Sequence, residues 1–442
     1  MPENADDKAL SATGRDMLAL AAELFPVCRS ITGEGLRRSF EILGRHIPLV
    51  LTEIPTGTPV FDWTIPREWN IRGASIARLD GTRVVDFAQH NLHVVQYSTP
   101  IDAVVSLDEL RRHIHTLPDH PDWIPYRTSY YSESWGFCLT QTELQSLRDP
   151  EYRVVIDSSL EQGHLTYAEC IVRGASEEEV LLSCHSCHPS LANDNLSGMV
   201  VAAMLARHLM EAPRRYTYRF LFMPGTIGSL AWLAHNRDAV ARMRHGLVLS
   251  CLGDQGAMTY KQSRRGDAPI DRIVSYVLRQ DSDAHRVRPF IPYGYDERQY
   301  CSPGFNLPVG CLMRTPNGEY AEYHSSADNL SLLQSSSLDH SLAMLQKIVE
   351  VIEGDTTYLS LNQFGEPQLG RRGLYGTLGG QSFTGDRQMA LLWVMNLADG
   401  HHSLLDIAER SAIPFATIKA AADALLRVEL LKVLPETAGS HA

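Results

Sequence analysis

The sequence lacks three features that would each assign it to a particular class of protein. No apolar run approaches the roughly 18 residues that a membrane-spanning helix needs, and the opening stretch, MPENADDKALSATGRD, is acidic and polar where a secretory signal is basic and apolar. Basic residues are outnumbered by acidic ones, 40 to 52, which gives a formal charge of −12. We therefore expect a soluble cytoplasmic protein that binds neither nucleic acid nor a membrane.

Cysteine is too sparse for a disulfide framework. Eight cysteines are scattered over 442 residues, and this density suits a reducing compartment. A redox role for Cys184 and Cys187 is disfavoured, because such a pair normally opens a helix whereas these two straddle a predicted strand end. With 44% hydrophobic and 21% charged residues, a chain of this length has room for two or three globular domains.

Changes in the pattern of apolar residues predict the domain boundaries. Two helices are expected within residues 1–59, joined by CRSITGEG, which forms either a tight corner or a loop with free amides for an anion. Short alternating runs broken by proline and glycine predict a β-rich insertion at residues 60–150. Residues 151–360 alternate continuous apolar strands with amphipathic helices, which predicts an α/β sheet covered by helices on both faces.

The last segment, residues 385–442, has the pattern of a winged helix. QMALLWVMNLADG, HSLLDIAERS and PFATIKAAADALLRVELL predict three short helices, and LLKVLPE supplies a wing strand. Its 5 basic and 7 acidic residues give a net charge of −2 with no basic stripe. This charge argues against DNA binding and favours a packing or oligomerisation role, although no pattern establishes a homo-oligomer.

The most informative motif is LLSCHSCHPSLANDNLSGM at residues 181–199. An apolar strand ends in His185 and His188, and Asp194 follows six residues after the second histidine, close to the start of the next helix. Histidine and carboxylate side chains gathered at a strand end are typical zinc ligands. In an extended chain the two histidines cannot point the same way, so one ligand is expected from the pair unless a turn brings both inward. Asp194 could otherwise be only a helix N-cap.

A second group of candidate ligands lies downstream. His324, in EYHSSADNL, precedes a helix and is predicted to end a strand at the same sheet edge as His185. Asp254 closes HGLVLSCLGDQG at another predicted strand end, where a turn residue is an equally good interpretation. The sequence thus predicts a metal site shared by distant segments.

In these motifs the chain resembles the co-catalytic zinc aminopeptidase superfamily. A histidine ends a strand, Asp-Asn-x-Ser-Gly follows, FLFMPGTIGS closes a strand in Gly-Ser, and a late histidine precedes an aspartate. Nearly the whole chain is similar to a bacterial family of aminopeptidase-like proteins of uncertain function, often encoded near polysaccharide biosynthesis genes. The runs that carry this similarity are CRSITGEG, GTPVFDWTIPREWNI, SCHSCHPSLANDNLSG, TIGSLAWL, EYHSSADNL and ALLWVMNLADG. The resemblance implies a zinc-aminopeptidase-like mixed sheet flanked by helices, with an inserted β-rich domain and a C-terminal winged helix.

The chain departs from the superfamily at residues that matter for catalysis. The resemblance implies two adjacent glutamates before Gly228-Ser229, one a general base and one a metal ligand, yet Gly225 and Thr226 stand there. Cys187 replaces the aspartate expected two residues after the first histidine. We therefore expect a single zinc, held by His185 or His188 together with Asp194 and His324, with an open coordination position.

The general base must then come from elsewhere or be absent. Glu322 and Glu319 are the nearest carboxylates in sequence to His324, and alternation along a strand would place Glu322 on the same side as that histidine. Asp296 and Glu297, in the loop PYGYDERQY, are further candidates. Glu322 is the predicted catalytic residue.

The same loop supplies candidate substrate-binding residues. Tyr293, Tyr295 and Arg298, with Tyr300 nearby, are candidates to line a substrate pocket, because such loops lie at the carboxyl ends of strands. A mobile surface loop is at least as good an interpretation of the same segment. The predicted function is zinc-dependent hydrolysis of a small peptide-like or amide substrate. The alternatives are a metal-binding scaffold that has lost catalytic activity and an enzyme of amide or acyl transfer in a biosynthetic pathway.

Overall fold

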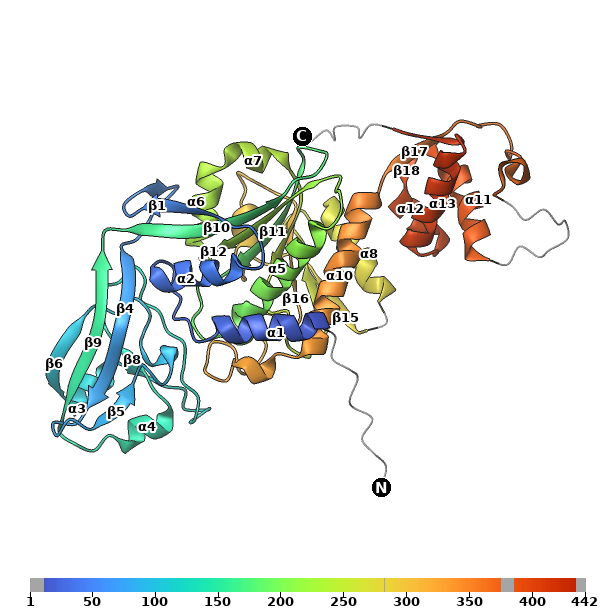
Figure 1. The fold of residues 1–442 in the computed structure, drawn as a ribbon. Helices are drawn as coiled ribbons and strands as arrows, with labels where there is room; N and C mark the ends of the chain where they lie inside the picture. The colour runs from blue at the N-terminus through green and yellow to red at the C-terminus, as the bar shows by residue number, and fades with distance from the viewer. Residues whose placement is uncertain (1–11, 282, 375–384, 435–442) are drawn as a thin grey trace, which may run out of the picture. The chain divides into compact units, whose positions relative to one another are not determined.

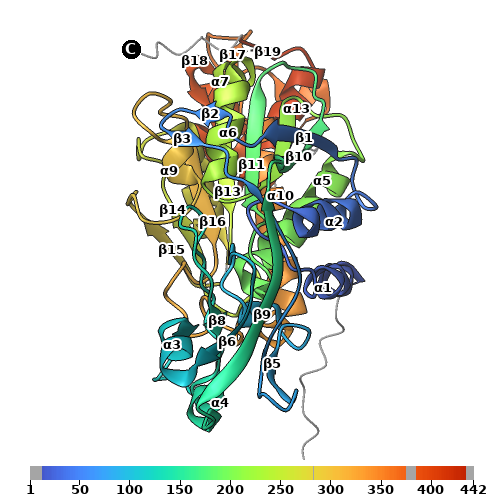
Figure 2. The same ribbon diagram turned by 90° about the vertical axis from the view of Figure 1, so that its left-hand side faces the viewer.

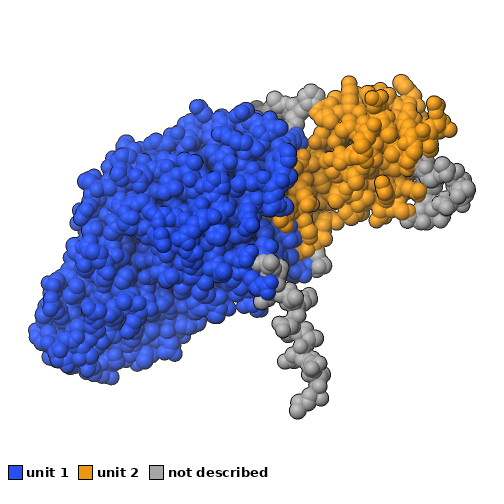
Figure 3. Space-filling view, in the orientation of Figure 1, with its two compact units in different colours: residues 1–272, 283–344 blue, residues 273–282, 345–442 orange. Residues whose placement is uncertain are grey.

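The computed structural model describes residues 12–281, 283–374 and 385–434. The chain forms two compact units, residues 1–272 with 283–344 and residues 273–282 with 345–442 (Figure 3). Residues 1–11 and 435–442, the ends of the predicted first and last domains, lie outside the described residues. All the residues predicted to bind metal or substrate belong to the first unit.

The first unit is built around a mixed sheet of eight strands (Figure 1). In spatial order the strands are β1 (Val50–Pro55), β10 (His164–Val172), β12 (Thr217–Met223), β11 (Glu179–His185), β13 (Met243–Leu249), β16 (Val309–Met313), β14 (Met258–Lys261) and β15 (His285–Arg288). The four central strands, β12, β11, β13 and β16, run parallel to one another. Strands β11 and β12 are buried at every position, as their continuous apolar runs require in a sheet covered on both faces. The predicted α/β architecture is confirmed.

Helices lie on both faces of this sheet (Figure 2). α6 (Ile227–His235) and α9 (Glu297–Tyr300) lie on one face, and α5 (Gly198–Leu209) lies on the other, packed against β10 to β13. The first unit also contains the short α7 (Arg237–Arg242) and the 3₁₀ turn η3 (Leu330–Leu332), while α8 (Pro269–Gln280) and α10 (Ser335–Gly354) extend into the second unit. The carboxyl ends of the parallel strands therefore remain open to the loops that follow them.

The N-terminal helices are α1 (Ala12–Leu24) and α2 (Glu34–Leu43), as the apolar periodicity predicts. The CRSITGEG segment between them forms a tight corner. Gly33 has φ +96°, and a Cβ on Gly35 would lie 1.8 Å from the carbonyl oxygen of Cys28, so both positions require glycine. The backbone N–H of Glu34 donates to Asn70 Oδ1 at 2.7 Å, which already satisfies an amide that an anion would need.

The β-rich insertion is present and ends later than predicted. Its strands are β2 (Pro59–Val60), β3 (Trp63–Thr64), β4 (Glu68–Ala77), β5 (Arg83–Asp86), β6 (Ile101–Ser106), β7 (Ile114–His115), β8 (Phe137–Cys138) and β9 (Glu151–Glu161), with α3 (Leu107–Arg112), α4 (Gln141–Ser146) and the 3₁₀ turn η1 (Asn91–His93). β9, predicted as the first strand of the α/β sheet, instead pairs with β4 and β6 in the sheet β5-β4-β9-β6. The reason is visible in its burial, which alternates as in a half-exposed antiparallel strand.

The second unit contains the predicted winged helix. Its helices are α11 (Asp386–Leu397), α12 (Leu404–Ser411) and α13 (Phe415–Arg427), and its wing strand is β19 (Leu431–Val433). β17 (Thr357–Ser360) pairs with both β18 (Asp399–Ser403) and β19, so this fold begins near residue 357 and not at 385. Sequence periodicity could not reveal this strand, because its partners follow it by about 40 to 75 residues.

Two absences expected from the sequence can be compared with the structure. Every one of the eight cysteines is a free thiol, so the chain has no disulfide framework. Within the described residues, we find no helix with both the length and the apolar character that crossing a bilayer requires.

Candidate metal centre

The centre is assembled where β11 ends in the middle of the sheet. β11 runs parallel to β12 on one side and β13 on the other, so its last residue, His185, and the loop after it emerge at the open edge. That loop returns through Asp194 to the start of α5. His185, His188 and Asp194 are all buried, with at most 3% of each residue exposed.

Three histidines surround the carboxylate of Asp194. His185 Nε2 lies 2.7 Å from Oδ1, and His324 Nε2 lies 3.0 Å from Oδ2. One ring nitrogen of His185, one of His188 and an oxygen of Asp194 all lie within 4.8 Å of one another. The structure therefore brings together both histidines of the SCHSCHP motif, where the sequence required only one, and places His324 against the other oxygen of Asp194.

The electrostatics suit metal ligands. Burial alone would raise the pKa of Asp194, but the neighbouring His188 and His185 and the hydrogen bonds from His185 and His324 hold its pKa well below the usual value. Burial lowers the pKa of His188 well below that of an exposed imidazole. Asp194 is thus a carboxylate and His188 a neutral imidazole, the protonation states that can coordinate a metal.

The loop that carries these ligands is held by buried polar groups from distant segments. Asp328 accepts the backbone N–H groups of Asn193 at 2.6 Å and Asp194 at 3.0 Å. Arg29, at the corner before α2, donates from Nε and Nη2 to the carbonyl oxygen of His188 at 3.1 and 2.8 Å. Partners of this kind fix ligand orientation in metal sites, so CRSITGEG and the aspartate of EYHSSADNL both help to hold the loop of candidate ligands.

Aromatic rings enclose the cluster. Tyr295 stacks on His185 with ring centroids 3.8 Å apart, and its hydroxyl lies 3.0 Å from His188 Nε2. Tyr126, from the β-rich insertion, packs edge-on against His188 and His324 at 5.0 and 5.1 Å. The backbone N–H of Tyr126 also donates to the carbonyl oxygen of His324 at 2.8 Å. The insertion therefore forms part of the wall of the site.

The loop after β12 contains Gly225 and Thr226 in place of the expected glutamates. A Cβ on Gly225 would lie 1.9 Å from the Tyr295 ring, so this ring occupies the space of a side chain at 225. The backbone N–H of Thr226 and the hydroxyl of Ser229 both donate to Asp296 Oδ1, at 2.6 and 2.9 Å. Tyr295 and Asp296, from a loop about 70 residues later, thus fill the region from which the glutamates are missing.

Asp296 differs from the other candidate bases of the sequence analysis. Its Oδ2 is buried without a hydrogen-bond partner among the described residues, and burial raises the pKa of its carboxyl group to about 6. Glu319 and Glu297 are instead neutralised in ion pairs with Arg288 and Lys261. Asp296 is therefore the candidate whose uncommitted carboxylate oxygen is buried.

Two predicted site residues have other places in the fold. Asp254 lies outside the cluster, because its two oxygens accept hydrogen bonds from Asn193, Gly256 and Thr315, which makes it a turn residue as the alternative interpretation held. Glu322 lies in a turn and not in a strand. Alternation therefore does not place Glu322 beside His324, and its half-buried side chain makes no hydrogen bond or ion pair with the cluster among the described residues.

The predicted substrate-binding residues are divided among different environments. Tyr295 belongs to the cluster, while Tyr293 is 61% exposed and lines a separate cavity. Arg298 is half-buried on α9. Tyr300 is a core residue whose hydroxyl lies 2.9 Å from Ser183 Oγ.

Sequence reasoning assigned no role in the site to Tyr126, Arg29 or Asp328. Arg29 lies in CRSITGEG and Asp328 lies in EYHSSADNL. The available signal was a charged side chain in a glycine-containing segment for Arg29, and one that follows a histidine for Asp328. Tyr126 had none, because its run, WIPYRTSYY, has no periodicity that links it to the α/β sheet.

Comparison with known proteins places the chain in a family. The model of a domain of unknown function, DUF4910, matches residues 18–355, and a winged helix-turn-helix model matches residues 356–433. A Clostridium acetobutylicum protein is 50% identical over 424 residues, which cover 96% of this chain and 98% of the relative. That relative is named as a polysaccharide biosynthesis protein with an aminopeptidase-like domain.

Solved structures show the same fold. A crystal structure named as a peptidase from Clostridium acetobutylicum has a TM-score of 0.90 at 48% identity and covers 96% of this chain and 97% of that chain. A zinc aminopeptidase from Bacillus subtilis has a TM-score of 0.58 at 12% identity, covering 78% and 96%. A Peptidase M28 precursor from Shewanella amazonensis has a TM-score of 0.53 at 13% identity, covering 79% and 95%. The last two establish the fold alone, and this chain is a member of the DUF4910 family with an aminopeptidase-like domain followed by a winged helix.

Proposed function

We propose that this protein is a zinc-dependent hydrolase that cleaves an amide bond in a small peptide-like or N-acylated substrate. The observation that carries the proposal is the buried cluster of His185, His188 and Asp194, whose candidate ligand atoms lie within 4.8 Å of one another. Two imidazoles and a carboxylate are a donor set that zinc prefers, and three protein ligands leave a position open for catalysis. A bound zinc ion would polarise the substrate carbonyl group and lower the pKa of a water molecule.

The chain's own residues prepare this site in three ways. Asp328 and Arg29 hold the ligand loop by hydrogen bonds to its backbone atoms. Tyr295 presents a hydroxyl to the cluster, and because burial raises its pKa far above the ordinary value, this hydroxyl remains a hydrogen-bond donor for substrate oxygen. His324, whose side chain is 31% exposed, is the imidazole of the cluster that a substrate meets from solvent.

Zinc content is the first test of this proposal. We expect about one zinc per wild-type chain by plasma mass spectrometry, and loss of that zinc in His188→Ala and Asp194→Asn. His208→Ala, which changes a partly exposed histidine on α5 outside the cluster, is the matched control and should keep the metal. If the wild-type protein binds no zinc after incubation with zinc, the proposal is wrong.

Activity is the second test. Hydrolysis of aminoacyl p-nitroanilides and of N-acyl amino sugars should require zinc, and His324→Ala should abolish turnover while circular dichroism shows an intact fold. The amino sugars are included because the Clostridium acetobutylicum relative is named for polysaccharide biosynthesis.

A second function is favoured by the loop after β12. Gly225 and Thr226 offer no ionisable side chain, and loss of a general base typically lowers rates by about 10²–10⁴-fold. The site would then bind zinc and a ligand without hydrolysis. Stoichiometric zinc, ligand binding and no turnover across both substrate classes would support this scaffold function over the hydrolase.

A further inference from the structure

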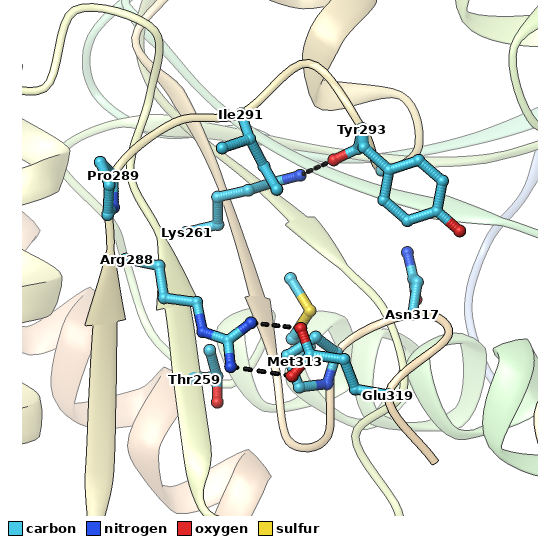
Figure 4. Close-up of a pocket in the computed structure, with 11 residues that line it drawn as sticks. Thr259, Lys261, Arg288, Pro289, Ile291, Tyr293, Met313, Asn317 and Glu319 are labelled. Carbon is cyan, nitrogen blue, oxygen red and sulfur yellow. Dashed lines mark hydrogen bonds and ion pairs between the residues drawn. The ribbon is translucent and has the colours of Figure 1, made fainter. Parts of the chain in front are cut away.

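A cavity of about 190 Å³ lies among the loops of the first unit that follow β15 and β16 (Figure 4). Its base is formed at the ends of neighbouring strands, by Lys261 of β14, Arg288 of β15 and Met313 of β16. The loop after β15 covers it with Ile291 and Tyr293. An apolar cavity of about 150 Å³ accommodates a benzene molecule, so this cavity has room for a group of about six non-hydrogen atoms.

The charged groups in its wall are already paired. Lys261 Nζ donates to the carbonyl oxygen of Tyr293 at 2.8 Å and forms an ion pair with Glu297. Arg288 forms a two-pronged ion pair with Glu319, with Nη2 and Oε2 2.8 Å apart (Figure 4). A charged ligand group would have to break one of these pairs, so the cavity favours a neutral group.

The remaining wall is mostly apolar, and its uncharged polar side chains are Asn317 and Thr259, whose hydroxyl already donates to the carbonyl oxygen of Ala257. Ile291 and Tyr293 are 50% and 61% exposed, although large apolar side chains are normally buried. Asn317 Oδ1 accepts hydrogen bonds from Ser250 Oγ and Cys251 Sγ at 3.3 and 3.2 Å. Its amide nitrogen points toward the cavity (Figure 4) and has no acceptor among the described residues. The cavity thus offers apolar contact and one hydrogen-bond donor.

Three connections join this cavity to the metal centre. Tyr293 and Tyr295 belong to one short loop, and Tyr295 stacks on His185. Asn317 is bound by Cys251, which follows β13 at the same sheet edge. Tyr320, next to the cavity residue Glu319, donates from its hydroxyl to Asp328 Oδ2 at 3.1 Å, and the same oxygen accepts the backbone N–H of Asp194.

We propose that this cavity binds an uncharged aliphatic group of the substrate, of about four to six non-hydrogen atoms, next to the amide bond that the metal centre cleaves. Such a group is either the side chain of an aminoacyl substrate or the acyl chain of an N-acylated one, and the two share the same chemistry. This inference rests on the proposed function for its position and adds the substrate class.

The test is calorimetric titration of the zinc-loaded protein with hydroxamates, whose metal-binding group is constant. L-leucine hydroxamate should bind about 10-fold tighter than glycine hydroxamate, from burial of the aliphatic group, and L-lysine hydroxamate should gain nothing over glycine. 4-Methylpentanohydroxamate, which lacks the amino group, separates the two sources: equal affinity to the leucine compound indicates an acyl chain, and weaker binding indicates an amino acid.

Matched variants test whether the preference for leucine hydroxamate over glycine hydroxamate arises in the cavity. Ile291→Glu should abolish the preference for leucine while leaving glycine hydroxamate unaffected. Val287→Glu alters a side chain of β15 that is 41% exposed and does not line the cavity, so it should change neither affinity. Equal binding of the leucine and glycine compounds to the wild-type protein overturns the inference.

The zinc content of the same samples shows separately whether the proposed function is wrong. If no zinc binds, the cavity is tested on the metal-free protein by thermal shift with 4-methylpentanamide against acetamide. Stabilisation by the longer amide in the wild type and Val287→Glu, but not in Ile291→Glu, supports the cavity without the metal chemistry. No difference between the two amides rejects it.

Discussion

The loops after the neighbouring parallel strands β11 and β12 have opposite compositions. The end of β11 and the loop after it contain three candidate ligands, His185, His188 and Asp194, within ten residues. The β12 loop contains Gly225 and Thr226, and the side chains that complete it, Tyr295 and Asp296, come from a distant loop. Groups at a sheet edge can therefore be supplied locally or by a remote segment, because several loops meet at the carboxyl ends of the strands.

The largest expected effect comes from placing a glutamate in the β12 loop. Gly225→Glu should destabilise the protein by about 3 kcal/mol, because its Cβ would lie 1.9 Å from the Tyr295 ring. The denaturation midpoint in urea measures this cost. When Tyr295 is first changed to alanine, Gly225→Glu should lower the free energy of unfolding by less than it does in the wild type. Equal losses in the two backgrounds would show that the Tyr295 ring does not occupy the space of a side chain at 225.

Asp296→Asn should reveal the cost of the buried carboxylate. Because the folded state raises its pKa from 3.8 to about 6, the folded chain binds more protons between these values, so stability falls as pH rises from about 4 to about 6. At pH 7.5 the loss is complete and amounts to at most about 3 kcal/mol. The asparagine variant should therefore be more stable than the wild type at pH 7.5 and similar near pH 4.

This comparison is made by urea unfolding of metal-free protein at both pH values. A variant that is equally stable or less stable than the wild type at pH 7.5 would contradict the burial of an uncompensated carboxylate at this position.

Asp328→Asn tests the support of the β11 loop. The amide can accept one of the two backbone N–H bonds from Asn193 and Asp194, so we expect zinc affinity to fall by about 10–100-fold, measured by competition with a chelator. Asp254→Asn, at a buried carboxylate that contacts Asn193 but no candidate ligand, is the control. Equal losses in the two variants would indicate general loosening of the loop.

The smallest effect is expected for Ser229→Ala in the β12 loop. This change removes a hydroxyl that lies 2.9 Å from both Asp296 Oδ1 and the carbonyl oxygen of Thr226 and donates to one of them at a time. The loss should cost about 1 kcal/mol in free energy of unfolding at pH 7.5. Zinc content should stay at the wild-type level, since Ser229 contacts no candidate ligand. Loss of zinc would show that the two loops are coupled more tightly than their contacts suggest.

Much of the fold could be predicted because its elements have strong local patterns. Continuous apolar runs identified β11 and β12. Helical periodicity identified the two N-terminal helices and the winged-helix segments. β9 was assigned to the wrong sheet because a single strand does not reveal its partners, and β17 was missed for the same reason. Glu322 was expected beside His324 because the segment was taken as a strand, whereas it forms a turn.

The residues around which the candidate site is built stand in recognisable motifs of the sequence. His185, Asp194 and His324 stand in contexts that bring them to one sheet edge, since each follows or precedes a regular element with a clear pattern. The folded chain was needed to show that His188 joins them, that Tyr126 reaches them from the insertion, and that Tyr295 and Asp296 fill the β12 loop. These contacts join segments separated by tens to hundreds of residues, and the chain path that closes such distances is set by the packing of the whole unit rather than by local pattern.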